Sequence, residues 1–169
     1  MKGKTLAVGT LVLCAAVAGM APVLPASAGS DHMAQSVSGH RYNVLGESVG
    51  LVGYDPVSYF PEGGGKPQRG LIGISQEHDG VTYRFASEDH LARFKKNPEK
   101  YLPAYGGWCA WAAGELAKRV DVDPESFEVR DGRLYLFYRD PALDTRALWV
   151  KKPADLIAKA NANWPALAQ

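Results

Sequence analysis

The sequence predicts an α+β domain in which a small antiparallel sheet, built from two hairpins, packs against about three helices. Two Asp-Gly pairs, Asp79-Gly80 and Asp131-Gly132, each lie between runs where apolar and polar residues alternate. Asp-Gly is typical of tight hairpin turns because glycine readily adopts a positive φ. Three other segments repeat apolar residues at helical spacing. Since composition does not change along this part of the chain, we expect a single domain over residues 42–169.

The first residues have the features of a secretory signal peptide. A short positive segment precedes an apolar run, and Ala26-Ser27-Ala28 fits the small-residue rule of signal peptidase. Glycine and proline interrupt the apolar run, which argues against a retained transmembrane helix. We therefore expect residues 1–28 to be removed by cleavage near Ala28. Residues 29–41 then form a flexible leader, and the mature protein is periplasmic or secreted.

Each predicted hairpin has a strand on either side of its turn. In the first, a run that starts at Leu71 leads to the turn, and apolar residues alternate with polar ones over 81–85. In the second, Phe127 and Val129 precede the turn, and alternation resumes over 134–138. Period-two alternation is typical of strands with one buried face.

The three predicted helices are supported by capping and periodicity. Ser87 can cap the first, which has acidic residues in its first turn and ends at Asn97-Pro98. The second is expected from about Tyr105 to Ala117, where apolar residues recur every three or four positions. The third is expected from Ala154 to about Asn163, with a proline just before it.

Composition and motifs exclude several classes of function. The net charge of the whole chain is +1, and no basic patch stands out, which argues against a nucleic-acid partner. The sequence contains no Ser-His-Asp set, phosphate-binding loop, HExxH motif or EF-hand loop. We therefore expect neither an enzyme nor integral membrane association, and the sequence identifies no protein partner.

Cys109 is the leading candidate for a metal ligand. It is the only cysteine expected in the mature chain, because Cys14 lies in the predicted signal peptide, so it has no partner for an internal disulfide. A thiolate suits Cu(I) or Zn(II), and His90 on the first helix is the candidate second ligand. The alternative interpretation makes Cys109 a core residue of its helix. His90 is then a semi-exposed histidine bonded to water or to a carboxylate.

Asp55, Tyr59 and Tyr105 are the candidate ligand-binding residues. The segment 53–60 combines aromatic side chains with a carboxylate beside a proline, and such a loop can line a pocket. An aspartate before proline also commonly accepts hydrogen bonds from nearby backbone amides. A thiol-dependent enzyme is a further alternative, since Gly106-Gly107 can offer backbone amides beside the thiol.

Several segments, taken in order, resemble the YHS domain family in its exported bacterial form. These are residues 53–60 (GYDPVSYF), 83–87 (YRFAS), Phe94, 97–98 (NP), 101–110 (YLPAYGGWCA), 122–124 (VDP), 131–136 (DGRLYL), Trp149 and 163–165 (NWP). The resemblance implies a small α+β domain. Related modules are associated with heavy metals, especially copper, and that association falls first on Cys109.

The function expected from this resemblance is a module that binds a metal ion, of the copper type, or a small ligand. A copper or zinc ion is the expected cofactor, and a metal ion or small molecule is the expected partner. The alternative is a non-catalytic structural or interaction domain in which Cys109 belongs to the core.

Overall fold

The computed structural model describes residues 41–46 and 48–169. The predicted signal peptide and all but the last residue of the predicted leader lie outside the described residues. The described chain is α+β, as predicted. Its elements, in chain order, are β1 (Val44–Leu45), β2 (Val49–Gly50), η2 (Leu51–Gly53), η3 (Pro61–Gly63), β3 (Leu71–His78), β4 (Val81–Phe85), α1 (Glu88–Lys96), α2 (Pro98–Tyr101), η4 (Ala104–Gly107), α3 (Ala110–Glu115), β5 (Asp123–Arg130), β6 (Arg133–Phe137), α4 (Thr145–Trp149) and α5 (Pro153–Leu167).

Both predicted hairpins are confirmed, β3–β4 and β5–β6. They do not share a sheet, however. One sheet has the strand order β1-β2-β4-β3, with β2 parallel to β4, and the other contains β5 and β6 alone. Isolated bridges join Pro103 to Leu134 and Cys109 to Leu136. The segment from η4 to α3 therefore runs along β6.

The first predicted helix is confirmed as α1. Its N-cap is Ser87, whose hydroxyl accepts a hydrogen bond from the backbone N–H of His90 at 3.2 Å, and Asn97 is its C-cap. The third predicted helix is present as α5 and extends to Leu167. The short helix α4, which Asp144 caps, was not predicted. Within the described ranges, no helix is both long and apolar enough to cross a membrane.

The second predicted helix is wrong in its first part. Tyr105 and Gly106 have φ values of 54° and 60°, which lie in the left-handed region and cannot continue a right-handed helix. The chain instead forms the 3-10 turn η4, and α3 begins only at Ala110. Cys109 is consequently the N-cap of α3 and does not lie within a helix.

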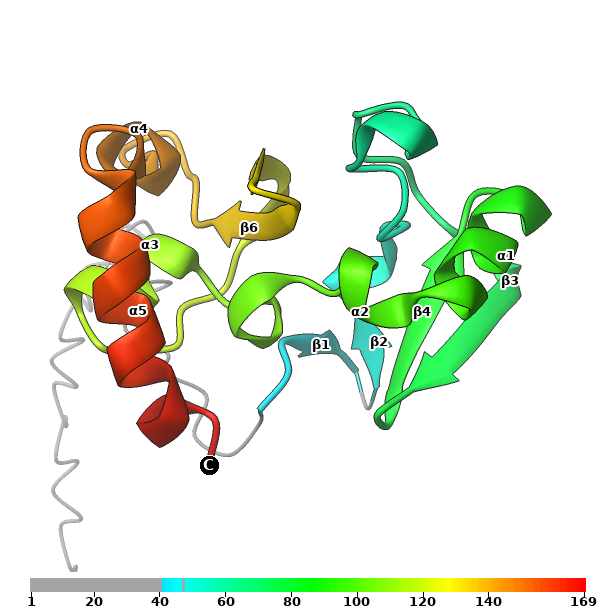
Figure 1. The fold of residues 1–169 in the computed structure, drawn as a ribbon, viewed down its shortest axis with the longest axis horizontal. Coiled ribbons are helices and arrows are strands. Elements are labelled where there is room, and N and C mark those ends of the chain that lie inside the picture. The colour runs from blue at the N-terminus through cyan, green and yellow to red at the C-terminus, as the bar shows by residue number, and fades with distance from the viewer. Residues whose placement is uncertain (1–40, 47) are drawn as a thin grey trace, which may run out of the picture.

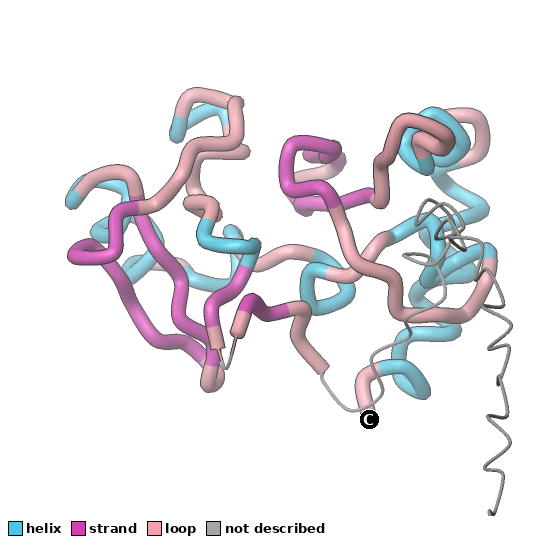
Figure 2. Tube along the Cα trace, turned by 180° about the vertical axis from the view of Figure 1, so that it is seen from behind, coloured by secondary structure: helices cyan, strands magenta, loops and turns pink. Residues whose placement is uncertain are grey.

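The molecule has two halves (Figure 1). The sheet half contains β1 to β4 and α1, and the helical half contains β5, β6, α3, α4 and α5. Figure 2 shows the same division from behind, with α2 and η4 crossing between the halves. One apolar cluster joins the sheet half to β6, with Phe85, Phe94 and Leu134 fully buried, and another lies in the helical half, with Phe137 and Trp149 fully buried. Residues 102–106 of this crossing segment line the candidate site.

Candidate functional site

Cys109 is a fully buried residue of the core. Its Sγ accepts a hydrogen bond from the backbone N–H of Tyr138 at 3.3 Å and lies 3.4 Å from the hydroxyl of Thr145. That hydroxyl also donates to the Tyr138 carbonyl at 2.8 Å, and in its contact with Cys109 either atom can be the donor. Burial raises the pKa of the Cys109 thiol, and the bond to Thr145 offsets this only in part. The side chain is therefore held as a protonated thiol.

Asp55 and His90 form a buried pair in the sheet half. One carboxylate oxygen of Asp55 accepts from the backbone N–H of Val57 at 2.8 Å. The other accepts from the N–H of Ala86 at 2.8 Å and bonds Nδ1 of His90 at 2.5 Å. Asp55 is completely buried, and the His90 side chain is 14% exposed. This confirms both structural interpretations, of an aspartate that satisfies backbone amides and of a histidine bonded to a carboxylate.

The two predicted metal ligands, Cys109 and His90, do not meet. Figure 1 places α1, which carries His90, and α3, which Cys109 caps, on opposite sides of the molecule. Within residues 41–46 and 48–169, no group of three or more histidine, cysteine, aspartate or glutamate side chains is arranged to hold a metal ion. A metal ligand must also lose its proton, whereas the Cys109 site favours the thiol. These residues do not fit a shared copper or zinc ion, and such a cofactor stays a prediction.

The Tyr59 side chain packs between the two halves. Its hydroxyl donates to the carbonyl of Pro124 at 3.0 Å, and its ring meets that of Phe127 edge-on at 5.1 Å. Burial raises its pKa far above the ordinary value of 10.0. Like Asp55, Tyr59 uses its polar group to bond the protein itself, so neither residue presents that group to a ligand.

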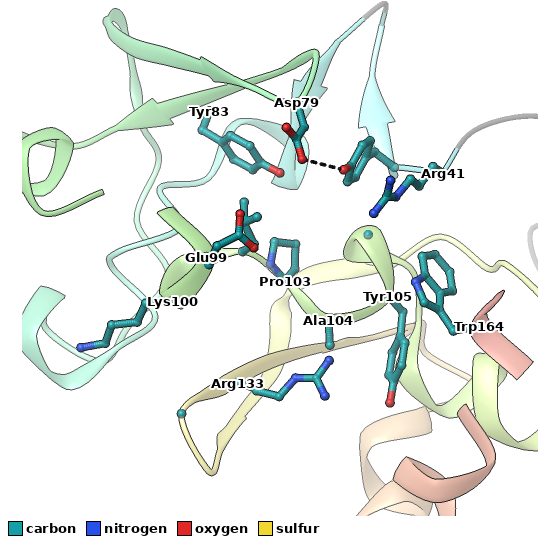
Figure 3. A pocket seen from close by; sticks show the side chains of 14 residues that line it. Arg41, Asp79, Tyr83, Glu99, Lys100, Pro103, Ala104, Tyr105, Arg133 and Trp164 are labelled. Carbon is teal, nitrogen blue, oxygen red and sulfur yellow. Dashed lines mark hydrogen bonds between the residues drawn. The ribbon is translucent and has the colours of Figure 1, made fainter. Parts of the chain in front are cut away.

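Tyr105, by contrast, lines a pocket between the two halves (Figure 3). The cavity has a volume of about 220 Å³. The Tyr105 hydroxyl donates to Asn161 at 3.1 Å, and Trp164 packs edge-on against its ring at 5.8 Å. These contacts with α5 hold the ring in place as one wall of the pocket.

One end of this pocket carries two carboxylates and the guanidinium of Arg41 (Figure 3). Asp79, Glu99 and the phenol rings of Tyr42 and Tyr83 line it. The Tyr42 hydroxyl donates to Asp79 at 3.3 Å, and Glu99 bonds His78 at 3.2 Å. Burial raises the pKa of Tyr83, and the charges of Asp79 and Glu99 raise it further. The two carboxylates are thus both close enough to Tyr83 to raise the pKa of its phenol.

Tyr83 has an unusual hydroxyl. The residue is only 3% exposed, and within the described part of the chain its hydroxyl has no hydrogen-bond partner. Figure 3 shows it directed toward the cavity beside Asp79. The oxygen itself stays accessible from the cavity, so a ligand or water there can bond it.

A second guanidinium, that of Arg133, also lines the pocket. The Arg133 guanidinium faces the rings of Tyr105 and Tyr135 at 6.0 and 5.7 Å. Burial raises the pKa of Tyr105 to about 12, while the charge of Arg133 acts in the opposite direction. Arg133 forms no ion pair with any carboxylate among the residues that the structure describes. Its charge is therefore free to meet an anion.

Sequence reasoning found Tyr105 but missed Asp79 and Arg133. Both lie at hairpin turns, Asp79 between β3 and β4, and Arg133 directly after the turn between β5 and β6. Charged residues at such turns are usually solvated, so nothing in the local sequence separates them from surface residues. The only usable signal was the pair of Asp-Gly turns itself, since the two turns border opposite ends of one pocket.

Comparisons of this chain with models of known protein families, with curated proteins and with solved structures find no match. The function is therefore argued from the residues and from the geometry of the pocket.

Proposed function

We propose that this protein is an exported, non-catalytic binding module of the YHS type that holds a small ligand in the pocket between its two halves. One observation carries this proposal. A cavity of about 220 Å³ is lined by aromatic rings, by charges of both signs and by the unpartnered hydroxyl of Tyr83. Ligand sites commonly combine such walls with a few convergent polar groups.

The surroundings of Cys109 support a non-catalytic role. A thiol-dependent enzyme needs an accessible thiolate beside a base. Cys109 is fully buried, its pKa is raised, and its hydrogen-bond partners are Thr145 and the backbone of Tyr138. No histidine takes part in these contacts, so the thiol is better suited to the core than to catalysis.

NMR titration with a library of small polar molecules tests the proposal. The indole N–H of Trp164 lines the pocket, whereas that of Trp149 is fully buried in the helical half. A ligand of the pocket is expected to shift the Trp164 signal and to leave that of Trp149 in place. A library in which no member shifts the Trp164 signal contradicts the proposal.

A pair of tyrosine variants tests whether the Tyr83 hydroxyl takes part. Tyr83→Phe removes one oxygen at the pocket, and Tyr101→Phe removes one whose bond is to Glu62 outside it. Losing a hydrogen bond to a ligand weakens binding by about fivefold to tenfold. We expect that loss for Tyr83→Phe and unchanged affinity for Tyr101→Phe, and equal affinity in both variants contradicts a role for the hydroxyl.

A further inference from the structure

Strand β3 forms an open edge of the larger sheet. The strand order β1-β2-β4-β3 places it last, and Figure 1 shows it at the outer side of the sheet half. The register with β4 shifts between Leu71 and Ser75, so the three residues between them have no partner in β4. A Cβ at Gly73 would meet no atom beyond its chain neighbours within 4 Å. Within the described ranges, no strand pairs with the outer side of β3.

This edge is apolar and uncharged. Leu71 is 55% exposed and Ile72 is 78% exposed, the highest value among the large hydrophobic side chains of the described chain. Residues 70–76 contain no charged side chain and no proline. Proteins usually protect an exposed edge with lysine or proline, or with a bulge that turns it away from other chains. The irregular part of β3 instead carries isoleucine, so it presents an apolar surface that a further strand can cover.

Two opposite charges flank this uncharged segment symmetrically. Arg69 lies four residues before Gly73, and Glu77 lies four residues after it. Both side chains are exposed. The Arg69 guanidinium donates to the Val52 carbonyl at 2.9 Å and lies over the Tyr54 ring at 4.3 Å. Neither Arg69 nor Glu77 forms an ion pair with another described residue, so both charges are available to another chain.

We propose that β3 pairs with β3 of a second copy of this chain, antiparallel and with Gly73 at the two-fold axis. In this register Arg69 of each copy lies opposite Glu77 of the other, and Ile72 lies opposite Ile74. Opposite charges and pairs of β-branched side chains both stabilise facing positions of neighbouring strands. Both copies use the same edge, so the assembly closes as a dimer. The opposite edge of the sheet is β1, which has only two residues and offers little for further growth.

The symmetry of the charges favours a second copy over another extended segment. An unrelated segment must carry an acidic and a basic residue at one fixed spacing, whereas a copy of β3 always carries them. Displacing one strand by two residues keeps the same side chains on each face but separates both charge pairs. None of residues 69–77 lines the ligand pocket, so this inference does not depend on the proposed function.

Sedimentation velocity at protein concentrations between about 5 and 500 µM tests for this dimer. We expect the mass to rise toward twice that of the monomer as the concentration increases. Ile72→Lys is expected to weaken dimerisation by at least about tenfold, because the change occurs twice in the interface and lysine at an edge opposes strand pairing. Val150→Lys is the matched control, since Val150 is also an apolar side chain and 51% exposed, but lies at the end of α4.

Two charge variants test the register. Arg69→Glu and Glu77→Arg each bring like charges together at both ends of their own dimer, so each is expected to dimerise more weakly alone. A mixture of the two restores opposite charges at both ends, and we expect it to form a heterodimer at concentrations where neither variant dimerises. If Arg69→Glu does not fold, the comparison of Ile72→Lys with Val150→Lys decides.

Three results overturn the inference. The first is a protein that stays monomeric at about 500 µM, which leaves the edge to a strand of another protein. The second is a dimer that Ile72→Lys does not weaken, since it must form elsewhere. The third is a mixture of the two folded charge variants that is no more dimeric than either variant alone.

Discussion

Replacing Asp55 with asparagine tests a hydrogen-bonded carboxylate that is completely buried. The carboxylate accepts hydrogen bonds from the amides of Val57 and Ala86 and bonds the ring of His90. It thereby joins the loop after η2 to the junction of β4 and α1. Asparagine has nearly the same shape but offers one oxygen and two N–H donors in place of two acceptor oxygens.

The expected loss follows from counting these contacts. If the remaining oxygen keeps the bond to Val57, the new NH₂ group faces the amide of Ala86, which then has no acceptor. A buried donor without a partner costs about 1–3 kcal/mol, and hydrogen bonds to a charged acceptor contribute about 1.5–3 kcal/mol. The His90 ring can exchange its proton between nitrogens and recover one contact. The net destabilisation is therefore expected to be about 2–4 kcal/mol.

Urea unfolding followed by tryptophan fluorescence measures this loss. With a slope of about 2 kcal/mol per molar, the midpoint is expected to fall by about 1–2 M. Asp131→Asn provides the control, because Asp131 lies in an exposed hairpin turn and asparagine tolerates its positive φ. If Asp55→Asn stays within about 0.5 kcal/mol of the unchanged protein, the range of ordinary surface substitutions, the account of this pair is refuted.

Two predictions concern burial of ionisable groups. Alkylation of Cys109 by iodoacetamide is expected to be limited by unfolding and to accelerate with urea, and rapid alkylation of the folded protein contradicts a core role. The pKa of Cys109 is raised in the folded protein. At a pH just above the ordinary value of 9.0, only the unfolded state therefore loses this proton. The free energy of unfolding is then expected to fall by about 1.4 kcal/mol per pH unit above that value. Burial of Tyr105, whose pKa is raised to about 12 from 10.0, extends the loss to higher pH. In Cys109→Ala the fall should begin only near pH 10, and an unchanged onset in unfolding titrations contradicts this assignment.

Local signals in the sequence predicted the parts of the fold that local chemistry determines. The two Asp-Gly turns and the Ser87 cap require only nearby residues, and all three are present. The second helix failed because its apolar spacing continued through Tyr105, whose left-handed φ depends on what surrounds it. Periodicity reports which side chains are buried and does not report where the backbone turns.

The candidate site was harder to predict because it is assembled from distant segments. Asp79 and Asp131 occupy equivalent turns with the same φ of 51°, yet only Asp79 lines the pocket. Asp79 accepts a hydrogen bond at 3.3 Å from Tyr42, another residue that lines the pocket and lies far from it in the sequence. Pairing Cys109 with His90 failed for the same reason, since each found partners closer in space, Thr145 for the thiol and Asp55 for the ring.

Gly106 shows how one motif acquires a different meaning in the folded chain. In the sequence, Gly106 lies close to Cys109, and we expected its backbone amide to be available to a thiolate. In the structure, a Cβ at Gly106 would lie 2.2 Å from the carbonyl oxygen of Arg41, and the Gly106 carbonyl accepts from the N–H of Asn43 at 2.9 Å. The glycine thus allows the segment that carries Arg41 and Tyr42 to pack directly on η4. Because both segments line the pocket, the absence of a side chain at Gly106 helps to shape the proposed binding site and provides nothing for catalysis at the thiol.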